Sequence, residues 1–238
     1  MMEWTLTTFL LANFILIVSS ILQMATGVSV GMIIVPFLAM ISYTLIPVPI
    51  VFASLTLTVM MAYKGREHID TKNMFQVIMG MLLGTLSAVY LLKTIHFEYL
   101  GLIFGLFILL SVFISLKLKF FKLSPIVNYT GGFFAGLMGT MAVVGGQILA
   151  LLFQNHPLES IKSTLAFLYS IFSVGMLCIF YTVGDFSYDQ MISGFYLMPG
   201  FIIAPVFVKY FNPKYSKAVV LGMATFGALV LIGKTFFS

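Results

Sequence analysis

Two clusters rich in glycine and small polar residues are the groups in this 238-residue chain best suited to hold a ligand. Their members are Thr26, Gly27, Ser29, Gly31 and Pro36 in the first cluster, and Gly139, Thr140, Gly145, Gly146 and Gln147 in the second. Glycine lets the backbone leave helical geometry without a Cβ penalty and lets a ligand approach the main chain. Proline cannot donate a backbone hydrogen bond to the preceding turn. We therefore expect each cluster to interrupt a helix.

The chemistry predicted for these clusters is non-covalent binding of an anion. A helix that restarts after a break points its free N–H groups and the positive end of its dipole outward, which favours negative charge. Thr26, Ser29, Thr140 and Gln147 would add neutral donors. For any single glycine the alternative is close helix packing of the small-xxx-small kind. Two clusters at matched positions favour the binding site.

Other chemistry has little support in the sequence. The three histidines, His68, His96 and His156, fall in turns, and the single cysteine, Cys178, lies in an apolar run and can form neither an intrachain disulfide nor a cysteine-based metal site. No nucleophile–base cluster, HExxH motif or phosphate-binding loop is present, so we expect no enzyme and no cofactor. His156 and Glu159 are the best candidates for a proton-carrying role, although a solvated turn is the favoured interpretation.

Composition shows what must position the two clusters. Hydrophobic residues make up 61% of the chain and charged residues 8%, with a mean hydropathy of +1.12, whereas soluble domains are about 45–50% apolar and about 25% charged. A membrane-spanning helix needs about 20 mostly apolar residues. Ten apolar segments are predicted at residues 6–24, 28–43, 46–63, 74–92, 98–116, 127–142, 143–153, 163–183, 190–208 and 217–236. The fold class is therefore an all-α polytopic membrane protein, in which 28–43 and 143–153 are short spans or re-entrant half-helices.

Basic residues predict the orientation, because cytoplasmic loops are enriched in Lys and Arg. Four loops are assigned to the inside, and they contain Lys64, Arg66 and Lys72; Lys117, Lys119 and Lys122; Lys162; and Lys209, Lys214 and Lys217. Lys93, Lys234 and the turn with Asp185 and Asp189 then lie outside, as do both termini. The N-terminal residues lack the basic start of a signal peptide, so the N-terminus is expected to be retained. Orientation also accounts for the net charge of +5 without a nucleic-acid partner.

The same assignment predicts an internal duplication. Residues 1–122 and 123–238 would each form a transmembrane repeat of five elements, the second inverted relative to the first. The stretch from Ala25 matches that from Leu137, Tyr63 matches Tyr181, and Met79 matches Pro199. Offsets of 112, 118 and 120 positions grow smoothly, as insertions in a duplicated chain would make them. Shared low complexity is the alternative explanation.

These motifs resemble the sulfite exporter TauE/SafE family of four-toluene-sulfonate-uptake-like membrane permeases. The resemblance spans the whole chain and rests on "TGVSVGMIIVP", on the turn "YKGREHID" and on "GGFFAGLMGTMAVVGG". It implies a bacterial-type inner-membrane permease for sulfite, organosulfonates or related anions, with the glycines and Pro36 named above at the motif positions. The chain departs from the family at Gln147, where many members have proline.

We therefore predict a secondary transporter of a small anion that works by alternating access around a midplane site between the repeats. Its partners would be that anion and the lipid bilayer, with H⁺ or Na⁺ as the candidate coupling ion. An anion channel is the nearest alternative, and a non-transporting assembly or scaffold protein is the next.

Overall fold

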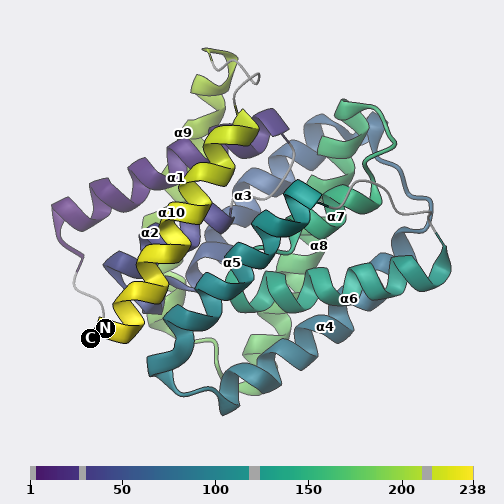
Figure 1. The fold of residues 1–238 in the computed structure, drawn as a ribbon. Helices are drawn as coiled ribbons and strands as arrows, with labels where there is room; N and C mark the ends of the chain where they lie inside the picture. The colour runs from purple at the N-terminus through teal and green to yellow at the C-terminus, as the bar shows by residue number, and fades with distance from the viewer. Residues whose placement is uncertain (1–3, 27–30, 118–123, 211–215, 238) are drawn as a thin grey trace.

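The computed structural model describes residues 4–26, 31–117, 124–210 and 216–237. This part of the chain contains ten α-helices and no strand, which confirms the all-α prediction (Figure 1). The helices are α1 (Leu6–Thr26), α2 (Gly31–Ile41), α3 (Val48–Lys64), α4 (Met74–Thr94), α5 (Leu100–Lys117), α6 (Pro125–Ala142), α7 (Gly146–Leu152), α8 (Leu158–Val183), α9 (Tyr188–Phe207) and α10 (Ser216–Phe237). Each predicted apolar segment corresponds to one helix.

Helix length separates spanning elements from short ones. By length and composition, α1, α4, α5, α8 and α9 can each cross a membrane. The two short segments form α2 with 11 residues and α7 with 7 residues. At 1.5 Å per residue they measure about 16 and about 10 Å, which is well below the roughly 30 Å of a hydrocarbon layer. Neither can span the bilayer.

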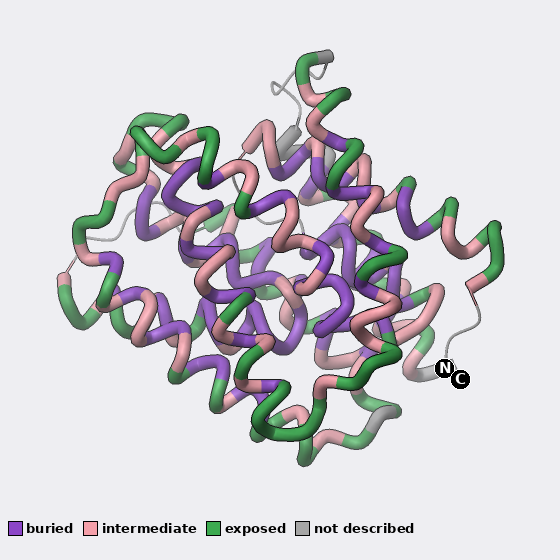
Figure 2. Tube along the Cα trace, turned by 180° about the vertical axis from the view of Figure 1, so that it is seen from behind, coloured by how far each residue is buried: buried purple, intermediate pink, exposed green. Residues whose placement is uncertain are grey.

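Burial follows the pattern of a protein surrounded by lipid. Buried residues lie at the middle of the bundle and exposed residues at its periphery (Figure 2). Many of the exposed side chains are large and apolar, among them Phe14, Phe75, Leu83 and Ile126, which are 58–75% exposed. Lipid, and not water, is the solvent that such a surface fits.

The helices pair in a pattern that repeats between the two parts of the chain. The most extensive contacts are α4 with α6, α1 with α9, α3 with both α8 and α9, and α5 with α10 (Figure 1). If α1–α5 are matched in order to α6–α10, the α4–α6 pair corresponds to α9–α1. The α3–α8 and α5–α10 pairs each join an element to its own counterpart. A two-fold relation between the repeats would produce this pattern, and the division at residues 122 and 123 stays a prediction.

The α4–α6 contact is built on two small-xxx-small motifs. A Cβ atom added to Gly80 or Gly84 of α4 would overlap a backbone carbonyl of α6, and one added to Gly132 or Gly136 of α6 would overlap a carbonyl of α4. Small residues let helix backbones approach closely inside a membrane. These four glycines have the close-packing role that was also the alternative for the clustered glycines.

The α1–α9 contact depends on a buried amide. Asn13 of α1 donates from Nδ2 to the carbonyl of Tyr196 at 2.9 Å, and its Oδ1 accepts from the N–H of Gly200 at 2.6 Å. A regular helix would pair those two backbone groups with each other. Pro199 lies beside them within α9, and an inserted side chain next to a proline is a recognised cause of a helix kink.

Candidate functional site

A cavity of about 50 Å³, here called the central pocket, lies where both parts of the chain meet. It is lined by residues of α1, α2, α3, α4, α6, α7, α8 and α9, and none of its lining residues is charged. Since a cavity needs roughly 10–15 Å³ to hold one water molecule, the pocket has room for about three to five waters or one small anion. The clustered residues on its wall are Gly31, Gly139, Gly145 and Gly146.

The first glycine cluster lies at the end of α1 and in α2. Helix α1 ends at Thr26, whose hydroxyl donates to the carbonyl of Leu22 at 2.8 Å, and α2 begins at Gly31. The predicted site residues Gly27 and Ser29 lie outside the described residues. A Cβ atom added to Gly31 would overlap the carbonyl oxygen of Val143, which lies between α6 and α7. The two clusters therefore touch each other.

The second break joins α6 to α7 through Val143, Val144 and Gly145. Val143 has φ +56° and ψ +24°, in the left-handed region that a β-branched residue rarely occupies. Its N–H donates to the carbonyl of Gly139 at 3.0 Å, and the hydroxyl of Ser111 on α5 donates to the carbonyl of Val144 at 3.3 Å. Gly145 is in the right-handed helical region. The expectation that the glycines make this bend is wrong, because Val143 makes it.

The glycine at 145 is required for close approach instead. A Cβ atom there would overlap the carbonyl oxygen of Ala135 on α6, so α7 can fold back onto α6 only if this position lacks a side chain. The fold-back places Gly146, the first residue of α7, on the pocket wall. Gln147 follows in the same turn and is buried.

Four described residues of the predicted site do not line the central pocket: Thr26, Pro36, Thr140 and Gln147. Two of them have other roles. The hydroxyl of Thr140 donates to the hydroxyl of Thr85 at 3.2 Å, in the interface between α6 and α4. Pro36 is fully buried in α2 and faces α10, where a Cβ added to Gly227 would lie 2.6 Å from its ring. Both residues support the fold around the pocket.

The polar side chains of the pocket come mostly from residues that the sequence did not single out. They are Gln23, Ser54, Thr58, Tyr169 and Ser173. Gln23 and Ser173 are only 6% and 4% exposed, and their side-chain polar atoms have no hydrogen-bond partner among the described residues. Glutamine near the end of an otherwise apolar span was the available signal. Tyr169 on α8 is also part of the pocket wall.

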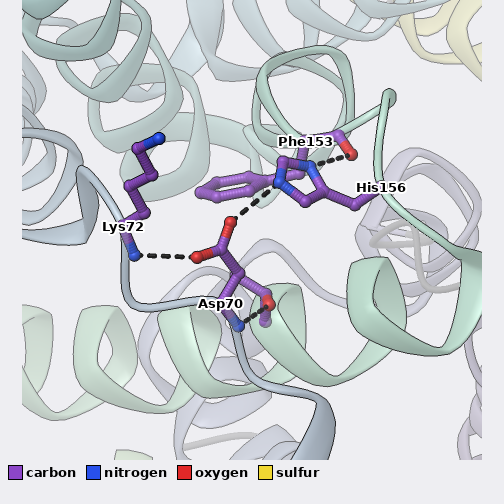
Figure 3. A network of polar contacts seen from close by, with 5 residues as sticks. Asp70, Lys72, Phe153 and His156 are labelled. Atoms are coloured by element: carbon purple, nitrogen blue, oxygen red, sulfur yellow. Dashed lines mark hydrogen bonds and ion pairs between the residues drawn. The ribbon is translucent and has the colours of Figure 1, made fainter.

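A second cavity of about 280 Å³, here called the polar cavity, lies at the loop end of the same helices. Its walls include Asp70, Lys72, Asn73, Asn128 and His156. His156 Nε2 is 2.8 Å from Asp70 Oδ2 (Figure 3). The two side chains are 29% and 23% exposed, so His156 is paired and largely shielded, in contrast to the solvated turn that was the favoured interpretation.

The two cavities share three walls. On α4, Met81 lines the central pocket and Val77 lines the polar cavity. On α7, Leu149 lines the pocket and Leu152 lines the cavity, and α6 also contributes residues to both. Four residues along a helix correspond to about 6 Å. The cavities are therefore separated by about one helical turn along α4.

Within the described part of the chain, no three His, Cys, Asp or Glu residues lie close enough together to bind a metal ion.

The sequence matches the family described as "Sulfite exporter TauE/SafE" over residues 12–233, which is nearly the whole chain. No curated protein and no solved structure matches it. The multi-pass helical architecture agrees with a family of membrane transporters.

Proposed function

We propose, from the premise that this chain belongs to the sulfite exporter TauE/SafE family, that it is a secondary transporter that moves a small anion such as sulfite or an organosulfonate across the cell membrane. The substrate site would be the central pocket. Transport would proceed by exposing this pocket alternately to the two sides of the membrane, as is usual for inverted repeats.

The observation that carries this proposal is that the start of α2 and the break between α6 and α7 meet at one pocket, whose described lining carries no charge and combines apolar with neutral polar side chains. Gly31 begins α2 and Gly146 begins α7, and both line the pocket. The N-terminal end of a helix carries the positive end of the helix dipole, which favours an anion. No carboxylate among the described residues lines the pocket to attract a cation.

The same pocket supplies neutral side-chain donors. Gln23 brings an amide from α1 and Ser173 a hydroxyl from α8. Buried polar groups without partners cost about 1–3 kcal/mol each. A bound oxyanion would accept hydrogen bonds from the Gln23 amide and the Ser173 hydroxyl and remove that cost.

Ion pairs at opposite ends of the bundle support the proposed topology. At one end Lys93 lies 3.4 Å from Asp185 and also donates to the carbonyl of Val183. At the other end Asp70 pairs with His156. Helices α4 and α8 therefore run in the same direction, with the loops of Lys72 and Lys162 at the end that the positive-inside rule assigns to the cytoplasm.

Uptake into vesicles tests the proposal. Purified protein in lipid vesicles should take up ³⁵S-labelled sulfite saturably and above protein-free vesicles, and sulfite or methanesulfonate should raise its thermal unfolding temperature more than acetate does. Electrical recording separates the channel alternative, which requires currents far above carrier rates. The proposed function would be refuted if the protein showed no uptake of sulfite and no stabilisation by any of these anions.

A further inference from the structure

The Asp70–His156 pair joins the two predicted repeats at the polar cavity. Asp70 lies in the loop between α3 and α4, and His156 lies in the loop between α7 and α8. Two hydrogen bonds hold Asp70 in place, one at its backbone N–H and one at its carboxylate (Figure 3). Its N–H donates to the hydroxyl of Thr164 at 2.8 Å, and its Oδ1 accepts from the N–H of Lys72 at 2.8 Å. The carboxylate is therefore positioned toward His156 and not free to turn into water.

The hydrogen bonds fix how many protons the pair holds. His156 Nδ1 is 3.1 Å from the carbonyl oxygen of Phe153. A carbonyl only accepts, so Nδ1 carries a hydrogen. An ionised carboxylate also only accepts, so the contact between Nε2 and Asp70 needs one more proton, on Nε2 or on the carboxyl group. If this proton leaves, a carboxylate faces a nitrogen lone pair across 2.8 Å and the bond is lost.

Several other charged and titratable groups lie near the pair, but most of them do not line the polar cavity. In the described chain the surrounding elements carry Arg66, Glu67 and His68 before Asp70, and Glu159 and Lys162 on α8. Lys162 is engaged with Glu159 at 3.4 Å, and Tyr129 on α6 is 41% exposed. Among the charged residues that the structure describes, Lys72 alone lines the polar cavity together with the pair.

We propose that Asp70 and His156 bind the proton that couples anion movement to a proton gradient. This inference rests on the proposed function. One proton passes between the pair and water in the polar cavity, and no other bond is made or broken. Since α4, α6 and α7 form walls of both cavities, loss of the bond between the two loops changes the support of the central pocket about one helical turn away.

Gradient-driven accumulation tests the pair. Vesicles containing wild-type protein, Asp70→Asn, His156→Gln or the matched control Lys162→Gln are loaded with equal ³⁵S-sulfite inside and outside, and a pH gradient is imposed. The wild type and Lys162→Gln should accumulate sulfite several-fold, whereas Asp70→Asn and His156→Gln should not exceed protein-free vesicles. All four should still exchange labelled for unlabelled sulfite at equal pH. Sulfite speciation is the same in every sample, so any difference belongs to the protein.

Accumulation by Asp70→Asn and His156→Gln at the wild-type level would overturn the proposal. If these variants also lose sulfite exchange, the proposal is tested by counting the protons that the protein takes up or releases when it binds an anion. Methanesulfonate, which stays ionised, is added to detergent-purified protein in weak buffer with a pH indicator. The wild type and Lys162→Gln should take up or release up to one proton per chain, and Asp70→Asn none. An equal count in wild type and Asp70→Asn overturns the proton site. Wild-type protein that moves no sulfite in either vesicle assay contradicts the proposed function instead, and the proton count still decides the pair.

Discussion

The central pocket and the polar cavity share the walls of α4, α6 and α7 but carry different chemistry. The pocket, about 50 Å³, is lined by apolar side chains, glycines, hydroxyls and one amide, while the cavity, about 280 Å³, contains Asp70, Lys72 and His156. Ionisable groups are expensive inside a bilayer. The described charged residues lie in loops and near helix ends, and the middle of the bundle is left to neutral groups.

Backbone conformation adds a second contrast between these regions. Each contains one non-glycine residue with positive φ, Val143 at +56° in the central pocket and Asn73 at +63° beside the polar cavity. Asparagine enters the left-handed region readily, whereas a β-branched residue there is strained by about 1–3 kcal/mol. Strain is thus concentrated at the proposed substrate site.

Filling the contact between the two clusters should cause the largest loss. We expect Gly31→Val and Gly145→Val to reduce sulfite uptake to the level of protein-free vesicles, because the new Cβ atoms overlap the carbonyls of Val143 and Ala135. Membrane abundance and size-exclusion profiles show whether the protein is still inserted and folded. Gly222→Ala on α10 is the matched control, since a Cβ there meets nothing within 4 Å. Wild-type uptake by both Val variants would remove the pocket as the site.

Removing the pocket amide should move stability and transport in opposite directions. Gln23→Leu deletes a buried polar group without a partner in the described structure, so the unfolding temperature should stay or rise. A hydrogen bond to a charged group contributes about 1.5–3 kcal/mol, so the apparent affinity for sulfite should fall by about 10- to 150-fold. Thermal unfolding and concentration-dependent uptake measure the two effects. Unchanged affinity in a well-folded Gln23→Leu protein would show that this amide does not contact the anion.

The smallest effect should appear where the two positive-φ residues are compared. At an ordinary helical position alanine is more stable than glycine by about 0.8–1.0 kcal/mol. At Val143 and at Asn73 we expect the reverse order, with the Gly variant more stable than the Ala variant by about 1 kcal/mol, because only glycine enters the left-handed region without cost. Unfolding of the four variants in detergent provides the measurement. If the Val143→Ala variant were as stable as the Val143→Gly variant or more stable, the strained conformation at this position would be contradicted.

Much of the fold could be predicted from the sequence because hydrophobic runs and glycine punctuation are local signals. All ten segments correspond to helices, and the second break falls where Gly145 and Gly146 indicated it. The residue that makes the bend could not be predicted, since nothing in the type of Val143 indicates a left-handed backbone. Its conformation is imposed by tertiary contacts with α2 and α5.

The polar side chains of the site were harder to predict from the sequence than the helices. Gln23, Ser54 and Ser173 come from three helices, and only packing brings them to one pocket. His156 was singled out from its position after the short segment, but its partner Asp70 is 86 residues earlier in the chain, so spacing could not reveal the pair.

The bond between Asn13 and α9 also has a consequence for biosynthesis. Helix α1 carries an amide whose backbone partners, Tyr196 and Gly200, are encoded 183 and 187 residues later. At about 5–20 residues per second, their synthesis follows about 10–40 s afterwards. During that interval Asn13 can use only local acceptors such as the carbonyl of Phe9, so the nascent protein inserts α1 into the bilayer well before that helix can dock.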